Sequence, residues 1–268
     1  MSQDYKQIIQ REYLNCVKSP VHFMKKYCKI QHPTKGKIKF NLYDYQEEML
    51  SEFVDNRYNI ILKSRQLGIS TLSAGYSLWM MLFNQDKNIL VIAKDKDTAK
   101  NLVTKVRIMY ANLPQWLKTK VIEDNKLSLV FSNGSQIKAV AATAEAGRSE
   151  ALSLLVIDEA AFIDKIDSIW TAAQQTLATG GDCIALSTPN GVGNWFHQTC
   201  MDAEISNNDF YMTTLPWDVH PDRDQEWFEK ETKNMSRRQI AQELECNFNM
   251  SGETVFHPED MELIQANL

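Results

Sequence analysis

The sequence lacks cysteine pairs, long apolar runs and an excess of basic charge. Its 268 residues include five cysteines, and none of them forms a CxxC pair or another short metal-ligand spacing. A zinc site and a disulfide framework are therefore not expected, and a reducing compartment is indicated. No apolar stretch reaches the roughly 18 residues that a membrane-spanning helix needs, and the polar N-terminus is unlike a signal peptide. We expect a soluble protein with no membrane partner that is not exported.

Acidic residues outnumber basic ones. The chain has 29 Lys and Arg against 34 Asp and Glu, a formal net charge of −5, which argues against a protein whose whole surface attracts nucleic acid. One local cluster differs, because aromatic residues and histidine are interleaved with six lysines at positions 25, 26, 29, 35, 37 and 39. Such a mixture could hold a phosphate backbone. A solvated basic surface beside the entry to the domain is the favoured interpretation.

Hydrophobic periodicity predicts alternating helices and strands. Helical patterns cover residues 4–30 (with Pro20 opening a second segment), 44–53, 71–81, 97–113 and 166–177. Short apolar runs, typical of buried parallel strands, lie at residues 59–62, 88–93, 154–157 and 183–186. This alternation indicates an α/β fold with a mostly parallel sheet flanked by helices. Asn133-Gly134 between residues 126–131 and 136–140 predicts one hairpin.

The pattern changes after residue 205. Two helices are expected at residues 226–234 and 236–246, the second opened by a capping box from Ser236 to Gln239. We expect no further parallel strand there. The chain is accordingly divided into an N-terminal helical lid segment (1–40), a core (41–204) and a small helical subdomain with a linker (205–268).

The segment from Lys63 to Thr71 joins a predicted strand to a predicted helix and partly matches the phosphate-loop pattern G-x-x-x-x-G-K-[ST]. Gly68 and Ser70 match the second glycine and the hydroxyl. Lys63 replaces the first glycine, and Ile69 replaces the lysine. A lysine at the front of such a loop could reach the β and γ phosphates from the other side. An ordinary strand-to-helix turn with Ser70 as a cap is the alternative.

Two carboxylates end the apolar strand at 154–157. Asp158 and Glu159 lie where open α/β sheets bind their ligands, so Asp158 could hold Mg²⁺ through water and Glu159 could polarise the attacking water. Capping of the next helix near Phe162 is the alternative, but the phosphate loop upstream favours nucleotide hydrolysis. Ser187 and Thr188 end the following strand, where a hydroxyl can sense the γ-phosphate, and a turn over residues 189–191 is compatible with that role.

Together these segments resemble the ATPase domain of a tailed-phage large terminase subunit, including its Walker A and Walker B motifs. The resemblance covers roughly residues 40–200, and the residues that carry it are Asp44-Tyr45-Gln46, Ser64-Arg65-Gln66-Leu67-Gly68, Val156-Ile157-Asp158-Glu159-Ala160-Ala161-Phe162 and Leu186-Ser187-Thr188-Pro189-Asn190-Gly191. It implies a P-loop NTPase of the ASCE/RecA-like type with a small helical C-terminal subdomain.

The resemblance also assigns roles. It implies that Gln46 reads adenine with Tyr45 packed on the base, that Ser70 ligates Mg²⁺ beside Asp158, and that Glu159 is the catalytic carboxylate. Ser187 and Thr188 would form the motif that couples hydrolysis to movement. The ATP phosphates would be bound by the variant loop, which consists of Lys63, Ser64, Arg65, Gln66, Leu67, Gly68, Ile69, Ser70 and Thr71.

The negative charge that develops in the transition state of ATP hydrolysis also needs an arginine to stabilise it. Arg148 resembles a residue that related motors offer to a neighbouring subunit, and a glycine beside it suits an exposed loop. Arg65, inside the phosphate loop, resembles a finger that acts in cis. Arg148 in trans is favoured, with Arg65 as a sensor of the γ-phosphate.

The implied function is a Mg²⁺-dependent ATPase that drives double-stranded DNA into a procapsid in the host cytoplasm. The implied partners are the portal protein, the small terminase subunit and further copies in a ring. Nuclease activity is not expected, because no later strand carries a carboxylate cluster. Two alternatives remain. A helicase-like translocase would need a second RecA-like half, and an inactive docking or DNA-binding module would fit Ile69 but leave Glu159 without a use.

Overall fold

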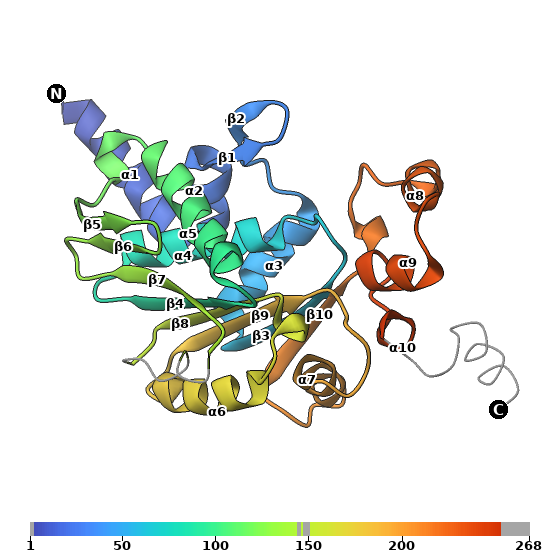
Figure 1. Ribbon diagram of the computed structural model, residues 1–268. Coiled ribbons are helices and arrows are strands. Elements are labelled where there is room, and N and C mark those ends of the chain that lie inside the picture. Colours follow the sequence, from blue (N-terminus) through green and yellow to red (C-terminus); the bar gives the residue numbers. More distant parts are fainter. Residues whose placement is uncertain (1–2, 144–145, 147–150, 253–268) are drawn as a thin grey trace, which may run out of the picture.

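A central sheet organises the molecule. The computed structural model describes residues 3–143, 146 and 151–252. In these residues eight strands form one sheet in the order β10-β3-β9-β8-β4-β7-β6-β5 (Figure 1). The strands are β3 (Tyr58–Lys63), β4 (Asn88–Ala93), β5 (Val121–Asn125), β6 (Ser128–Phe131), β7 (Gln136–Ala141), β8 (Leu154–Asp158), β9 (Asp182–Ser187) and β10 (Phe210–Leu215).

Most of the sheet is parallel. Neighbouring strands from β10 to β7 pair in parallel, whereas β7, β6 and β5 pair antiparallel. The predicted hairpin around Asn133-Gly134 is therefore confirmed as β6–β7. All residues of β8 are buried, as expected for a parallel strand with helices on both faces. The predicted α/β class is confirmed.

Helices cover both faces of the sheet. Helices α2, α3, α4 and α5 pack on one face, and α6 and α7 pack on the other (Figure 1). The helices are α1 (Gln3–Lys18), α2 (Pro20–Tyr27), α3 (Asp44–Asp55), α4 (Ile69–Phe83), α5 (Lys96–Ala111), α6 (Ile166–Leu177), α7 (Trp195–Glu204), α8 (Gln225–Thr232), α9 (Arg237–Glu243) and α10 (Phe248–Ser251), with short 3₁₀ turns at Gln115–Leu117, Ala160–Phe162 and Trp217–Val219.

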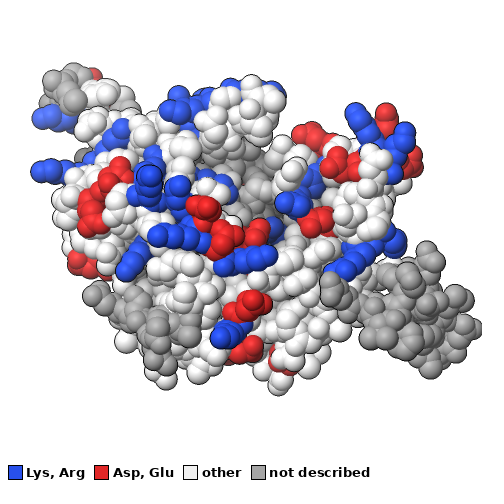
Figure 2. Space-filling view, in the orientation of Figure 1, with Lys and Arg blue, Asp and Glu red and all other residues white. Residues whose placement is uncertain are grey.

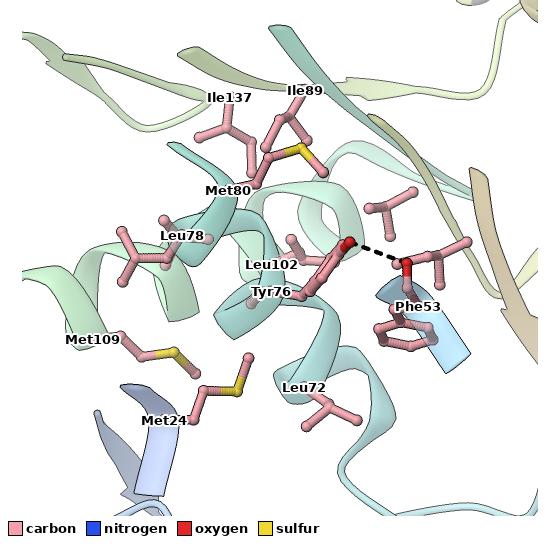
Figure 3. Packing of buried hydrophobic residues seen from close by; sticks show 14 of the residues in the cluster. Met24, Phe53, Leu72, Tyr76, Leu78, Met80, Ile89, Leu102, Met109 and Ile137 are labelled. Carbon is pink, nitrogen blue, oxygen red and sulfur yellow. Dashed lines mark hydrogen bonds between the residues drawn. The ribbon is translucent and has the colours of Figure 1, made fainter. Parts of the chain in front are cut away.

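Helix α4 is buried on nearly every side, and its neighbours hold it tightly. The Tyr76 hydroxyl donates a hydrogen bond of 3.0 Å to Phe53 O of α3, as Figure 3 shows. A Cβ atom on Gly75 would lie 2.8 Å from the sulfur of Met24, so α2 approaches α4 closely at this glycine. Dense packing of this kind resists displacement. The segment that precedes α4 is therefore anchored to a rigid helix.

The prediction that no parallel strand follows residue 205 is wrong. Strand β10 pairs in parallel with β3 at the edge of the sheet. Its sequence, FYMTTL, places Thr213 and Thr214 within the strand and leaves Tyr211 exposed. An edge strand of this kind lacks the continuous apolar run of a central parallel strand, which is why periodicity did not reveal it. Strand β5, helix α7 and helix α10 were not predicted either.

Two smaller units complete the fold. Strands β1 (Lys29–His32) and β2 (Gly36–Lys39) form an antiparallel hairpin around the predicted turn at 33–36. Residues 216–252 carry α8 to α10 beside the sheet (Figure 1), and the capping box of Ser236 and Gln239 is confirmed. In the part of the chain that is described, no helix is long and apolar enough to cross a membrane. The division at residues 40 and 204 stays a prediction.

Candidate nucleotide site

The phosphate-loop segment and the acidic pair meet at one edge of the sheet. Strand β9 lies between β3 and β8, with Leu62 opposite Ser187 and Asp158 opposite Leu186. The Ser70 hydroxyl donates a hydrogen bond of 3.1 Å to Asp158 Oδ1, although the two residues are 88 positions apart. The carboxyl ends of these parallel strands therefore bring the loop and the carboxylates together, as expected for a ligand site in such a sheet.

The loop backbone depends on Gly68. This residue has φ +78° in the left-handed region and caps α4, and Thr71 N and Leu72 N donate to its carbonyl oxygen at 3.0 and 2.9 Å. A Cβ atom here would lie 2.8 Å from Gln46 Nε2. Any other residue would thus suffer both backbone strain and a steric clash. Beyond Gly68 the first N–H groups of α4 have no intrahelical acceptor and can bind an anion.

Ile69 stands at the lysine position of the pattern but offers no group to a phosphate. Its side chain is 1% exposed and belongs to the hydrophobic core. Lys63, at the end of β3, is the partly buried cation of the loop. Burial lowers the pKa of Lys63, while the carboxylates of Asp158 and Glu159 act in the opposite direction. Lys63 therefore lies in the field of both acidic residues, at the place where a phosphate chain would need a counter-charge.

Asp158 is the buried member of the acidic pair, at 6% exposure. Its Oδ1 accepts hydrogen bonds of 3.1 Å from both Ser70 Oγ and Glu159 N. A carboxylate next to a hydroxyl fits Mg²⁺, which prefers oxygen ligands and usually takes only one or two from the protein, with phosphate and water completing its shell. Among the described residues no group of three or more His, Cys, Asp or Glu could hold a metal ion by itself. The donor set therefore suits a metal that arrives with a nucleotide.

Glu159 has an unusual backbone conformation. Its φ and ψ of 57° and 42° are left-handed, its side chain is exposed, and it makes no cap hydrogen bond to the 3₁₀ turn that follows, as far as the structure is described. A non-glycine residue in this region costs of order 1–3 kcal/mol and is typical of functional sites. The capping interpretation of Glu159 is therefore not supported. The strained backbone instead presents its carboxylate to solvent beside Asp158.

Tyr45 and Gln46 contact the loop. The Tyr45 hydroxyl and Gln46 Nε2 both donate to Leu67 O, at 2.8 and 2.9 Å, and Gln46 Oε1 accepts from Tyr43 N at 3.2 Å. Both side chains are buried, and burial raises the pKa of Tyr45. Both polar ends of Gln46 are thus bonded to protein groups. Its adenine-reading role stays a prediction.

Of the two predicted arginines, Arg65 lies in the described part of the chain. The guanidinium of Arg65 is exposed and pairs with Glu243 Oε2 at 3.2 Å, and Arg65 N donates to Glu243 O at 2.7 Å. Ser64 N likewise donates to Leu215 O at 2.7 Å. The start of the loop is therefore attached to β10 and α9. Arg148 lies outside the described residues.

Ser187 and Thr188 lie at the end of β9 and are buried. Ser187 Oγ accepts a hydrogen bond of 3.2 Å from Ala161 N, just beyond Glu159. Further along, Gly191 N donates to Ser251 Oγ at 2.9 Å. Residues 187–191 therefore contact both the turn that follows Glu159, through Ser187, and α10, through Gly191.

Sequence reasoning missed Arg223. Its guanidinium donates to Ser64 Oγ at 3.3 Å, to Arg65 O at 3.2 Å and to Gln66 O at 3.3 Å, and it lies over the ring of Trp227. Burial lowers the pKa of Arg223. Because its partners are mainly backbone carbonyls, the sequence gives no pairing signal for this contact.

Sequence reasoning also missed Lys105 of α5. Together with Thr71 it lines a cavity of about 100 Å³, and its charge interacts with those of Asp158 and Lys63. Burial lowers the pKa of Lys105. A signal was present, because position 105 follows Leu102 by three residues and so lies on the apolar side of the helix.

A loop that partly matches the phosphate-loop pattern follows β3, and an acidic pair stands at the end of β8, with β9 between the two strands. This arrangement is typical of the P-loop NTPase fold. The family model described as terminase large subunit, T4likevirus-type, N-terminal, matches residues 60–263. The chain belongs to this family.

Solved phage terminases share the fold. The ATPase domain of the Thermus phage P74-26 large terminase is 20% identical, with TM-score 0.64, over 78% of this chain and 94% of that one. The HK97 bacteriophage large terminase is 18% identical, with TM-score 0.61, over 94% of this chain and 51% of its own. The large terminase of another, thermophilic bacteriophage, solved in complex with ADP, is 14% identical, with TM-score 0.58, over 72% of this chain and 48% of its own. This chain therefore spans about half the length of the last two.

Proposed function

We propose that this chain is the ATP-hydrolysing motor domain of a large terminase, which powers translocation of double-stranded DNA into a procapsid. The hydrogen bond of 3.1 Å between Ser70 and Asp158, with Glu159 next in the chain, is the observation that carries the proposal. Membership of the terminase family supports it, as do structures of the large terminase of the thermophilic bacteriophage in complex with ADP and with ATP-γ-S.

Each part of the site has a task in this proposal. The N–H groups around Gly68 and the amine of Lys63 bind the phosphate chain of ATP, and Ser70 and Asp158 hold Mg²⁺. When bound, the metal neutralises charge on the phosphate oxygens. Glu159 orients the attacking water and accepts its proton, for which its exposed position beside Asp158 is suited. Arg65 and Arg148 are the candidates for stabilising transition-state charge.

The remaining assignments concern binding and partners. Tyr45 and Gln46 would contribute to the adenine site, and Ser187 and Thr188 would report the γ-phosphate to α10 through the contact of Gly191 with Ser251. We place the chain in the host cytoplasm, in a ring on the portal protein, with the small terminase subunit as a further partner. DNA would be held through its phosphates without regard to sequence.

Phosphate release tests the proposal. Wild type, Glu159→Gln and Lys63→Ala are compared with ATP and Mg²⁺, with and without double-stranded DNA. Glu226→Gln on α8 serves as a control, because it removes an exposed carboxylate to which the proposal gives no role. We expect turnover in wild type and in the control, and loss of turnover in the other two variants.

Equal phosphate release from all four proteins would refute the catalytic assignment. The outcome would then favour the alternative of a nucleotide-fold module that only docks or binds DNA. Isothermal titration with ATP-γ-S keeps the two interpretations apart, because Glu159→Gln should still bind nucleotide while Lys63→Ala should bind it more weakly.

A further inference from the structure

The β1–β2 hairpin carries four lysines in a segment without acidic residues. We call Lys29, Lys35, Lys37 and Lys39 the hairpin lysines. Residues 29–39 contain no Asp or Glu, and all four side chains are exposed. Among the ion pairs of the described residues, none involves a hairpin lysine.

Neighbouring lysines have a different environment. Lys25 pairs with Glu47, and Lys26 pairs with Glu12, both within the adjoining helical layer. These two lysines of the original basic cluster are therefore neutralised by the protein itself. The hairpin lysines are the part of the cluster whose charge faces solvent.

Strand register fixes the direction of this charge. Lys29 lies opposite Lys39, and Ile30 lies opposite Ile38. Because side chains alternate between the faces of a strand, the isoleucines share one face and Lys29, Lys37 and Lys39 share the other, while Lys35 lies in the turn between the strands. Ile30 packs against the hydrophobic core, so the lysine face points away from the body. The hairpin projects from the molecule (Figure 1), and Lys or Arg side chains flank the projection in Figure 2.

Stability does not account for this arrangement. Like charges directly opposite each other across a strand pair are destabilising, and an isolated two-stranded hairpin is marginal in water. The pairing of Lys29 with Lys39 therefore opposes folding of the hairpin. A polyanion laid against the lysine face would remove this repulsion.

The hairpin also borders the nucleotide site. Ile30 and Gln31 line the same cavity of about 100 Å³ as Thr71, in the first turn of α4, and Lys105. The hairpin itself thus lies next to the helix that follows the loop, while its lysine face is turned to solvent. This placement suits a partner on which the ATPase acts.

We propose that the hairpin lysines bind the phosphate backbone of double-stranded DNA. The inference rests on the proposed function for the choice of DNA as the polyanion. Lysine ammonium groups are flexible point charges that contact phosphates without reading bases, as a sequence-independent translocation surface requires. The major groove of DNA is also wide enough to admit a two-stranded β-ribbon.

Fluorescence anisotropy of a labelled random-sequence duplex tests the proposal with the 268-residue chain. One variant changes all four hairpin lysines to Gln, and a second changes them to Arg. A control changes four other exposed lysines to Gln and so makes the same change in net charge; these are Lys120, Lys126, Lys230 and Lys233.

We expect the Gln variant to bind DNA at least tenfold more weakly at low salt, and the Arg variant to bind like wild type. The slope of log affinity against log salt should fall by up to about 3.6 in the Gln variant, since each lost phosphate contact removes about 0.9. The control should keep most of the affinity. Thermal unfolding of the Gln variant should be unchanged or improved, because the repulsion between Lys29 and Lys39 is gone.

Three outcomes would overturn the proposal: no DNA binding by wild type, undiminished binding by the Gln variant, or equal losses in the Gln variant and the control. Polyglutamate that binds the hairpin as tightly as DNA would assign the surface to an acidic protein instead. Phosphate release without DNA is measured in parallel. Loss of hydrolysis with hairpin-dependent DNA binding intact would count against the proposed function and leave this inference standing.

Discussion

Replacing Gln46 with leucine tests whether this side chain supports the phosphate loop. It is 3% exposed, and its amide bonds to Leu67 O at 2.9 Å and to Tyr43 N at 3.2 Å. Leucine is of similar size and removes both hydrogen bonds. A net contribution of about 0.5–1.5 kcal/mol for each bond gives a loss of roughly 1–3 kcal/mol. No larger penalty is expected, because Leu67 O retains the Tyr45 hydroxyl at 2.8 Å.

The same energy should appear in nucleotide affinity. If binding has to restore the loop conformation, roughly 1–3 kcal/mol corresponds to about 5- to 150-fold weaker affinity. Support of the loop concerns the phosphates, so ATP, ADP and GTP should all lose affinity by a similar factor. A residue that reads adenine would instead lose the preference for ATP over GTP.

Isothermal titration with the three nucleotides, together with urea unfolding, measures both quantities for Gln46→Leu. Ser51→Ala is the control, because it lies on the same helix and removes one exposed hydrogen bond within that helix. The reasoning is refuted if Gln46→Leu keeps wild-type stability and GTP affinity while its preference for ATP disappears. That result would assign the residue to the base.

Three further predictions concern residues around the site. Arg223→Ala removes the hydrogen bonds from the guanidinium to the loop, and we expect the free energy of unfolding in urea to fall by about 1.5–3 kcal/mol. Arg223→Lys should restore only part of this loss. An unchanged midpoint of urea unfolding would contradict the prediction. Lys105→Ala should weaken ATP binding severalfold more than ADP binding, because the charge of Lys105 interacts with that of Asp158. Lys100→Ala on the same helix should not have this effect. Equal losses of ATP and ADP affinity in Lys105→Ala would count against a role of Lys105 at the γ-phosphate. Burial lowers the pKa values of His197 and His220 from 6.5. As the pH falls, these histidines are therefore protonated in the unfolded chain before they are protonated in the folded one, and the free energy of unfolding should decline through about pH 6.5. Changing both histidines to Asn should flatten that decline in unfolding experiments between about pH 7.5 and 5.5.

The central strands were predictable because burial on both faces demands apolar residues throughout. The runs at 59–62, 88–93, 154–157 and 183–186 all lie in strands of the sheet. Asp158 and Ser70 were predictable for a related reason. The carboxyl ends of parallel strands share one edge, so polar residues after two buried strands can be expected to meet.

Other features depend on contacts that leave little trace in the sequence. Strand β10 has solvent on part of its surface and mixes Thr213 and Thr214 with apolar residues. The loop is bonded to Glu243 O and Leu215 O, and any residue type supplies a backbone carbonyl. The left-handed conformation of Glu159 could not be predicted from the sequence either, because glycine and asparagine are the residues that usually adopt it.

The attachment of the loop to Leu215 and Glu243 bears on where this protein can be cut. Two of the loop amides, those of Ser64 and Arg65, are occupied by acceptors that follow residue 204 in the chain. A fragment trimmed to the predicted core would keep every residue of the loop, yet it would lose the acceptors that orient the first two. The smallest fragment that keeps the loop together with both of these backbone acceptors therefore extends at least to α9.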